Sequence, residues 1–172
     1  MHDFSFLNSK CAFPEPASAE KAALGLEHWL EATEAAGLSD LGKQSISDPH
    51  ARKALEAIFG NSQFLTASIL RDPNFTYKLL TTDPSQTLEG IIDGRNHHHA
   101  APLDNETLSR LLRVAKREMA LTVALADIAG LWPLGKITGA LSEFAEAALR
   151  LASVYVLRET AEQGGFTLTN PK

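Results

Sequence analysis

The sequence has little cysteine, few tyrosines and tryptophans, and no long apolar run. Its single cysteine, Cys11, has no partner for an internal disulfide, so a reducing compartment is expected. Only two Tyr and two Trp occur beside abundant Ala and Leu, which favours helix over sheet. No apolar run approaches the roughly 18 residues of a membrane span, and residues 1–4 lack the features of a secretion signal. We therefore expect a cytoplasmic protein that makes no contact with a membrane.

An excess of positive charge is missing too. The 172 residues carry 21 acidic and 16 basic side chains, which gives a formal net charge of −5. Such a charge does not draw the whole molecule to nucleic acid, so no nucleic-acid partner is expected. The hydrophobic fraction of 44% is ordinary for a chain that buries a core, and the length suits one domain.

The first half of the chain contains several residue patterns that are typical of helix starts. Serine and aspartate are good N-caps, and a proline directly after the cap fits the first helical position, where its missing N–H costs nothing. Five helices are predicted before residue 94, and they start at Ser18, Asp48-Pro49, Ser62, Asp72-Pro73 and Asp83-Pro84. The first is expected to end at Gly37 and the second at Gly60. Phe64, Leu65 and Ile69 are expected to face inward.

Two long helices are predicted in the second half. Asp104 caps one that runs to about Ala129, and the other runs from about Thr138 to Gln163. The short link 130–133, with its glycine and proline, makes them an antiparallel pair. The inward face expected of the second long helix consists of Leu141, Phe144, Ala145, Ala148, Ala152 and Tyr155. Further apolar residues, for which this face has no room, are Leu149, Leu151, Val154, Val156 and Leu157.

The predicted fold class is therefore all-α: a helical bundle with a long antiparallel helix pair preceded by about five shorter helices. Residues 1–17 are expected to form an extended N-terminal arm and residues 18–165 a helical domain. The tail 166–172 carries no capping or docking pattern. We expect it to be a linker towards a further domain.

Motifs for catalysis or metal binding are incomplete. Residues 37–44 match a phosphate-binding loop except that Gln44 replaces the hydroxyl residue that binds magnesium, and a strand does not precede them; a turn that ends a helix is favoured. His97, His98 and His99 are adjacent, and adjacent imidazoles rarely converge on one ion, so an exposed loop is favoured over a metal site. No Asp-x-Asp pair occurs, and Cys11 lies in the predicted arm. We expect no catalytic residue and no metal site in this chain.

Two groups of charges are the candidate binding or docking residues. One group is a basic stripe that consists of Arg110, Arg113, Lys116 and Arg117. Within it, Arg113 and Arg117 repel each other unless a negative charge pairs with them. The stripe is either a solvated face, or paired with acids on a neighbouring helix, or a patch that docks an anion or a partner. Asp127 opposes the helix dipole, which we expect backbone N–H groups at the start of the second long helix to offset.

Three segments resemble a known family when they are taken in order. They are 57–65 (AIFGNSQFL), 111–131 with LLRVAKREM and ADIAGL, and 137–145 (ITGALSEFA). Over about residues 50–160 they are similar to the N-terminal helical region of the bifunctional glutamine synthetase adenylyltransferase. The resemblance implies a parent enzyme with two nucleotidyltransferase domains: one removes AMP from a tyrosine of glutamine synthetase by phosphorolysis, the other attaches AMP from ATP.

The same resemblance implies magnesium, ATP and ADP as cofactors of the parent, and glutamine synthetase and the PII signal protein as its partners. The family's metal-binding carboxylates belong to a strand beyond the helical region, so no catalytic residue carries over to this chain. We expect the segment to pack against a nucleotidyltransferase domain of the same polypeptide through its long helix pair. A free-standing helical interaction module is the alternative, and a helical nucleic-acid binder is disfavoured by the net charge.

Overall fold

The computed structural model describes residues 4, 6–7, 11–96 and 104–165, and this part of the chain contains helices and no strand. The predicted all-α class is confirmed. The helices are α1 (Ala19–Ala35), α2 (Ser39–Ser47), α3 (Pro49–Asn61), α4 (Gln63–Arg71), α5 (Pro73–Thr81), α6 (Pro84–Asn96), α7 (Asn105–Ile128) and α8 (Leu134–Glu162).

The predicted starts of the five shorter helices and of the first long helix are confirmed, whereas the second long helix begins at Leu134, four residues before the predicted Thr138. Ser18 accepts from the backbone N–H of Lys21 at 3.2 Å, and Asp48, Ser62 and Asp72 cap α3, α4 and α5 in the same way. The predicted end of α1 also holds, because Gly37 follows it with φ +74°, a conformation that glycine adopts without strain. One end is wrong by a residue: Gly60 continues α3, which ends at Asn61.

One helix was missed. The residues that resemble a phosphate-binding loop contain the start of α2 rather than a turn alone, which raises the number of helices before residue 94 to six within the described residues. Helix α2 is stabilised by tertiary contacts, because Leu41, Gly42 and Ser45 are buried against α1. The buried indole N–H of Trp29 donates to the Ser45 hydroxyl at 2.8 Å, and that hydroxyl donates to the Gly42 carbonyl.

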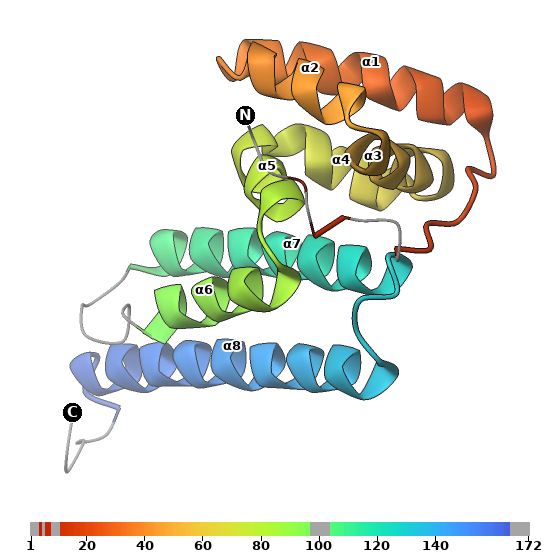
Figure 1. Cartoon of the computed structure of the whole chain (residues 1–172). Coiled ribbons are helices and arrows are strands. Elements are labelled where there is room, and N and C mark those ends of the chain that lie inside the picture. The colour runs from red at the N-terminus through yellow and green to blue at the C-terminus, as the bar shows by residue number, and fades with distance from the viewer. Residues whose placement is uncertain (1–3, 5, 8–10, 97–103, 166–172) are drawn as a thin grey trace.

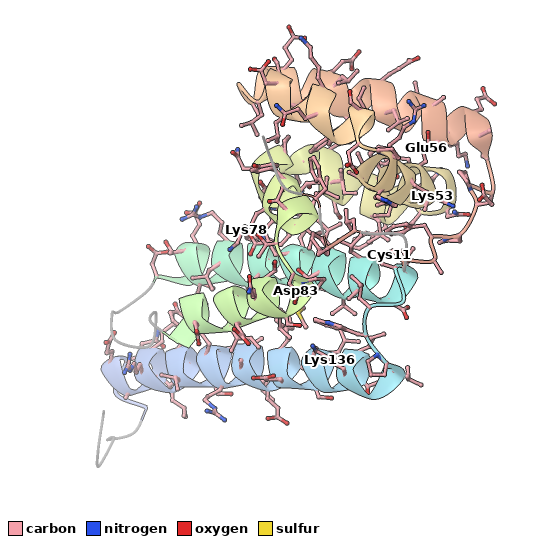
Figure 2. All side chains as sticks on the ribbon, viewed as in Figure 1. Cys11, Lys53, Glu56, Lys78, Asp83 and Lys136 are labelled. Atoms are coloured by element: carbon pink, nitrogen blue, oxygen red, sulfur yellow. The ribbon has the colours of Figure 1, made fainter. Side chains whose placement is uncertain are left out.

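The helices stack in successive layers, with α1 and α2 at one end and α8 at the other (Figure 1). The middle layers hold α3, α4 and α5, followed by α6 beside α7. Helices α7 and α8 run antiparallel, as predicted, and α6 packs against both of them. Lys136 in the first turn of α8 ties it to α6, since its ammonium donates to the Ser85 hydroxyl at 2.7 Å and lies 4.6 Å from the centre of the Trp132 ring (Figure 2).

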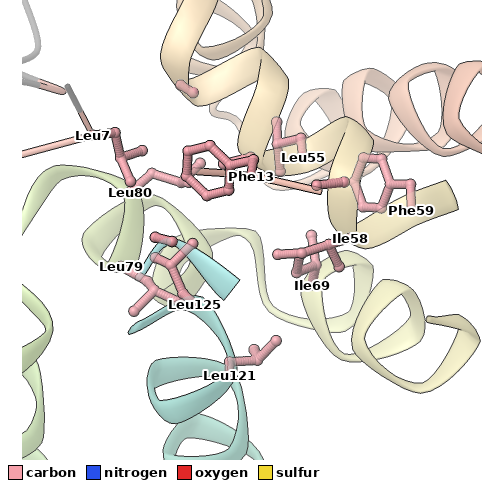
Figure 3. Packing of buried hydrophobic residues seen from close by; sticks show 14 of the residues in the cluster. Leu7, Phe13, Leu55, Ile58, Phe59, Ile69, Leu79, Leu80, Leu121 and Leu125 are labelled. Carbon is pink, nitrogen blue, oxygen red and sulfur yellow. The ribbon is translucent and has the colours of Figure 1, made fainter. Parts of the chain in front are cut away.

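Helix α7 joins two apolar cores because opposite faces of it are buried. Leu121, Leu125 and Ala129 pack with residues of α1, α3, α4, α5 and α6 in the larger core, part of which Figure 3 shows. Met119 and Val123 belong to the smaller core, which α6 and α8 complete. Helix α6 also contributes to both cores, through Ile91 in the larger one and Leu88 in the smaller one, so α6 and α7 together connect α8 to the rest of the molecule.

The lead-in segment before α1 contributes to the larger core. Phe4, Leu7 and Phe13 are all buried there, although the described part of residues 1–17 contains no helix. The thiol of Cys11 lies 3.7 Å from the Phe6 carbonyl oxygen. The domain boundaries at 17 and 165 stay predictions, but this segment is packed against the helices rather than held away from them.

Two predicted inward faces are wrong in part. Phe64 is 63% exposed, because the buried side of α4 is set by Ser68 and Ile69. Leu141 and Ala145 point outward on α8, whose buried residues are Ile137, Ala140 and Leu151. Helix α8 is apolar on more than one side, so periodicity alone did not settle which side meets α6 and α7. The His97–His99 loop and the tail 166–172 lie outside the described residues.

Candidate functional site

A groove of about 590 Å³ lies between α4 and α7. Each helix contributes one face with the spacing i, i+3, i+4 and i+7, which brings four side chains to the same side of a helix. The lining residues are Phe64, Ala67, Ser68 and Arg71 from α4, and Arg110, Arg113, Val114, Lys116 and Arg117 from α7. Seven residues of helix span about 10 Å, so the groove has the dimensions of a small-molecule site.

Positive charge dominates this groove. All four basic residues of the predicted stripe line it, and Arg71 from α4 is a fifth. No acidic side chain is among its lining residues within the described part of the chain. The contrast with the net charge of −5 for the whole chain means that the positive potential is concentrated at one place.

Arg117 is the one lining cation with an ion pair in the described residues. Its guanidinium donates to the carboxylate of Asp72 at 2.8 Å, and both side chains are largely shielded, with 17% and 27% of their areas exposed. Its Nε is buried and has no hydrogen-bond partner among the described residues. Of the readings left open, pairing with an acid on a neighbouring element is therefore confirmed for Arg117 alone.

The other cations of the groove reach solvent. Arg71, Arg113 and Lys116 are exposed and form no salt bridge within the described part of the chain. Arg110 is exposed as well, and its charge contributes to lowering the pKa of Asp104. Phe64 adds an exposed aromatic ring to the same groove. The site thus combines several available cations with one aromatic surface.

Asp127 lies apart from this groove. It is exposed in the last turn of α7, and in the residues that the structure describes no backbone N–H at the start of α8 donates to its carboxylate. Instead, its main-chain oxygen accepts from Gly130 N at 2.9 Å. The expected side-chain role at the start of α8 is therefore wrong, because Pro133 precedes that helix and α8 begins without a side-chain cap.

The sequence pattern did not predict three residues in or beside the site, which are Arg71, Phe64 and Asp72. Their signal is weak: Phe64, Ala67, Ser68 and Arg71 share one face of α4, but nothing in the sequence says that this face lies beside the basic stripe. Within the described residues, no three His, Cys, Asp or Glu side chains gather in a way that could hold a metal ion. None of the described helices has the length and apolar character needed to cross a membrane.

The Gly60-Asn61-Ser62 segment, which carries the first part of the family resemblance, has a structural role at each position. Gly60 packs so closely on Pro16 that a Cβ atom would overlap its side chain. The Asn61 side chain accepts from Ala17 N at 3.0 Å and donates to the Glu15 carbonyl at 3.1 Å, while Ser62 caps α4. This segment therefore holds the lead-in and the α3–α4 turn in place.

Fold and groove together define a helical module with a groove lined by basic side chains. The family model for glutamate-ammonia ligase adenylyltransferase matches residues 52–172. The chain belongs to this family, in agreement with the three resembling segments. No solved structure gives a match.

Curated relatives agree with the family model. Each of three relatives is named bifunctional glutamine synthetase adenylyltransferase/adenylyl-removing enzyme. The protein from Bradyrhizobium diazoefficiens is 35% identical over 147 residues, which cover 85% of this chain and 15% of the relative. That from Caulobacter vibrioides is 34% identical over 66% of this chain and 12% of the relative, and that from Bradyrhizobium sp. (strain ORS 278) is 32% identical over 93% and 16%. The chain thus spans about 15% of the length of such a relative.

Proposed function

We propose that this chain is the non-catalytic helical segment of an enzyme that adenylylates and deadenylylates glutamine synthetase. In the whole enzyme, nucleotidyltransferase domains attach AMP from ATP to a tyrosine and remove it by phosphorolysis, with magnesium as cofactor. Glutamine synthetase and the PII signal protein are the partners of that cytoplasmic enzyme. Family membership supports this proposal. It also favours the enzyme segment over a free-standing interaction module.

We base the proposed docking role of this segment on the outer face of α8. Five apolar residues follow this face at helical spacing: Leu134, Leu141, Ala145, Leu149 and Val156. Leu149 is 70% exposed and Val156 is 56% exposed, so the described helices leave both side chains largely in contact with water. The stripe extends over about 33 Å of helix at 1.5 Å per residue. An apolar stripe of this length in water usually marks an interface.

The occupant that we propose is a nucleotidyltransferase domain of the same polypeptide. The matched region amounts to only 15% of the Bradyrhizobium diazoefficiens relative, so most of such an enzyme consists of other segments. A covalently linked domain has a high effective concentration at the α8 face, which favours docking even when the contact itself is weak. In this arrangement, α7 and α8 form a rigid platform that orients the domain that follows.

Docking can be measured with this chain and the separately produced remainder of the polypeptide from the same gene. We expect binding by isothermal titration calorimetry, and we expect Leu149→Glu with Val156→Glu to raise Kd by at least tenfold, because two charges would have to be buried without partners. Leu24→Glu on the distant helix α1 is the matched control, since Leu24 is an exposed leucine too. Self-association of the chain that the α8 double variant abolishes, without binding to the remainder, would overturn the docking proposal.

Catalysis is tested separately from docking. We expect this chain alone to release no AMP from adenylylated glutamine synthetase in the presence of magnesium and phosphate. Phosphoryl and nucleotidyl transfer normally needs carboxylates that hold the metal ion beside the phosphates. Magnesium-dependent release of AMP by the purified chain would contradict the proposal that the chemistry belongs to other domains.

A further inference from the structure

We propose that the groove between α4 and α7 binds a nucleoside polyphosphate without a metal ion, at a site separate from any site of adenylyl transfer. In this site Arg71, Arg113 and Lys116 hold the phosphates, and Phe64 carries the base. The proposal concerns a different surface from the α8 face and stands independently of the docking proposed there.

The charge of the groove sets the first requirement for the ligand. Arg71, Arg113 and Lys116 are exposed, form no salt bridge in the described residues, and line the same groove together with Arg110. Like charges this close repel one another, so a ligand with several negative charges would relieve that repulsion. Guanidinium groups hold phosphate oxygens in a paired geometry, which makes a phosphate chain a good match for two arginines and a lysine.

The Asp72–Arg117 pair favours a compact ligand, such as a phosphate chain, over an extended acidic peptide. It fixes Arg117 against the start of α5, so this guanidinium serves as a wall of the groove and is not free to follow a ligand. The remaining cations then lie on two rigid helices, which act together on one compact ligand. A phosphate chain supplies several charges within a few ångströms, whereas carboxylates on a helical peptide are spaced by about 5–6 Å.

Phe64 sets the second requirement for the ligand, which is a flat apolar group that can cover the exposed ring. An exposed phenylalanine costs free energy in water unless something covers it, and this one lines the same groove as the cations. Ala67 and Val114 add further apolar surface next to it. A purine or pyrimidine base stacks on an aromatic ring with little regard to its identity, so a nucleotide satisfies the aromatic and the cationic part at once.

The absence of acidic lining residues decides the role of magnesium. No carboxylate from the described residues lines the groove, so the chain offers no ligand for a divalent cation beside the phosphates. Magnesium would therefore neutralise the very charges that the cations recognise. We expect magnesium to weaken binding here, which is the opposite of its effect at a site of adenylyl transfer.

The test is calorimetric titration of this chain with ATP at low ionic strength and without magnesium. We expect one site, with affinity falling in the order ATP, ADP, AMP, and tripolyphosphate binding more weakly than ATP. Magnesium should raise Kd for ATP. Failure to bind ATP at millimolar concentration, or tighter binding when magnesium is added, would overturn the proposal.

Variants then locate the site. Arg113→Gln with Lys116→Gln should raise Kd for ATP by about tenfold or more, because two charged contacts are lost. Phe64→Ala should raise Kd for ATP several-fold and leave that for tripolyphosphate unchanged. The matched controls are Arg150→Gln, which removes an exposed charge from α8, and Leu24→Ala, which removes an exposed apolar side chain from α1; neither should change Kd. Circular dichroism verifies that each variant is folded.

Three outcomes of these titrations count against the proposal. Equal binding of ATP and tripolyphosphate, with no effect of Phe64→Ala, would show an adventitious polyanion only. Tighter binding of an acidic peptide than of ATP would make the groove a protein-docking surface. An Arg150→Gln effect as large as that of the groove variants would show that ATP responds to overall charge and not to this site.

Discussion

The guanidinium of Arg117 on α7 donates a 2.8 Å hydrogen bond to the same Asp72 carboxylate that caps α5. One carboxylate oxygen accepts from Phe75 N at 3.1 Å and the other from Arg117. A local helix signal in the sequence thereby becomes a link between elements that lie 45 residues apart. The link positions α7 against the α4–α5 corner and so shapes one wall of the cationic groove.

We expect Arg117→Gln to lower the free energy of unfolding by about 1–3 kcal/mol, because it removes a charge-assisted hydrogen bond in a shielded place. Urea unfolding measures the loss. Asp72→Asn is the partner variant, since asparagine still caps a helix but carries no charge. A double-mutant cycle should give a coupling of about 1 kcal/mol, and strict additivity of the two losses would show that the pair contributes nothing to stability.

We expect Gly60→Ala to destabilise the protein by about 1–3 kcal/mol, although alanine is the better helix former. An added Cβ would overlap the Pro16 side chain and lie 2.9 Å from the Pro16 Cα, and the backbone there cannot move aside without loosening the lead-in. Gly139→Ala on α8 is the matched control, because a Cβ there meets open space and should stabilise by about 0.5–1 kcal/mol. Thermal unfolding of both variants compares them, and equal shifts would contradict the close approach of Gly60 and Pro16.

We expect Ser45→Ala to cost about 1–3 kcal/mol, because the buried Trp29 N–H would lose its acceptor where water cannot replace it. Ser47→Ala removes a hydroxyl from the same helix and serves as the control. Its hydroxyl donates only to the Lys43 carbonyl at an exposed position, so a change within about 0.5 kcal/mol is expected. Chemical denaturation should separate the two variants. A Ser45 effect no larger than the control would mean that α2 is not held to α1 by this bond.

The pH dependence of the start of α7 follows from Asp104. The backbone N–H of Thr107 donates to this carboxylate and holds its pKa below the ordinary value of 3.8. A lowered pKa in the folded state gives stability that is present above the unfolded-state pKa and is lost as pH falls through the folded pKa. We expect the first turn of α7 to fray in acid, and carboxyl titration by NMR measures the midpoint. In Asp104→Asn this acid transition should vanish; an Asp104 midpoint at or above 3.8 would contradict the cap.

The starts of the helices were predictable because each depends on a few adjacent residues. Ser18, Asp48 and Asp72 satisfy backbone N–H groups two or three residues away, so no distant part of the chain is needed to read them. Helix α2 was missed for the opposite reason. It is held by the bond between Ser45 and Trp29, which are 16 residues apart, and its own sequence carries no strong cap.

Half of the candidate site was predictable as well. Arg113 and Arg117 are four residues apart on one helix, so helical geometry alone places them on one face. The contribution of α4 was not predictable, because α4 and α7 meet only after the chain has folded. Phe64 was even assigned to the wrong environment: its helix has apolar residues on more than one side, and packing of Ile69 decided which side is buried.

What the sequence by itself determined is the all-α class, the antiparallel long pair and the family, since caps, helical periodicity and short motifs are local properties of the chain. The tertiary structure alone decided which cations remain available. It paired Arg117 with Asp72, placed Arg71 and Phe64 beside Arg113, and turned Leu149 and Val156 outward. The physical reason is that charge pairing and burial depend on distances between helices, which no spacing along one helix can specify.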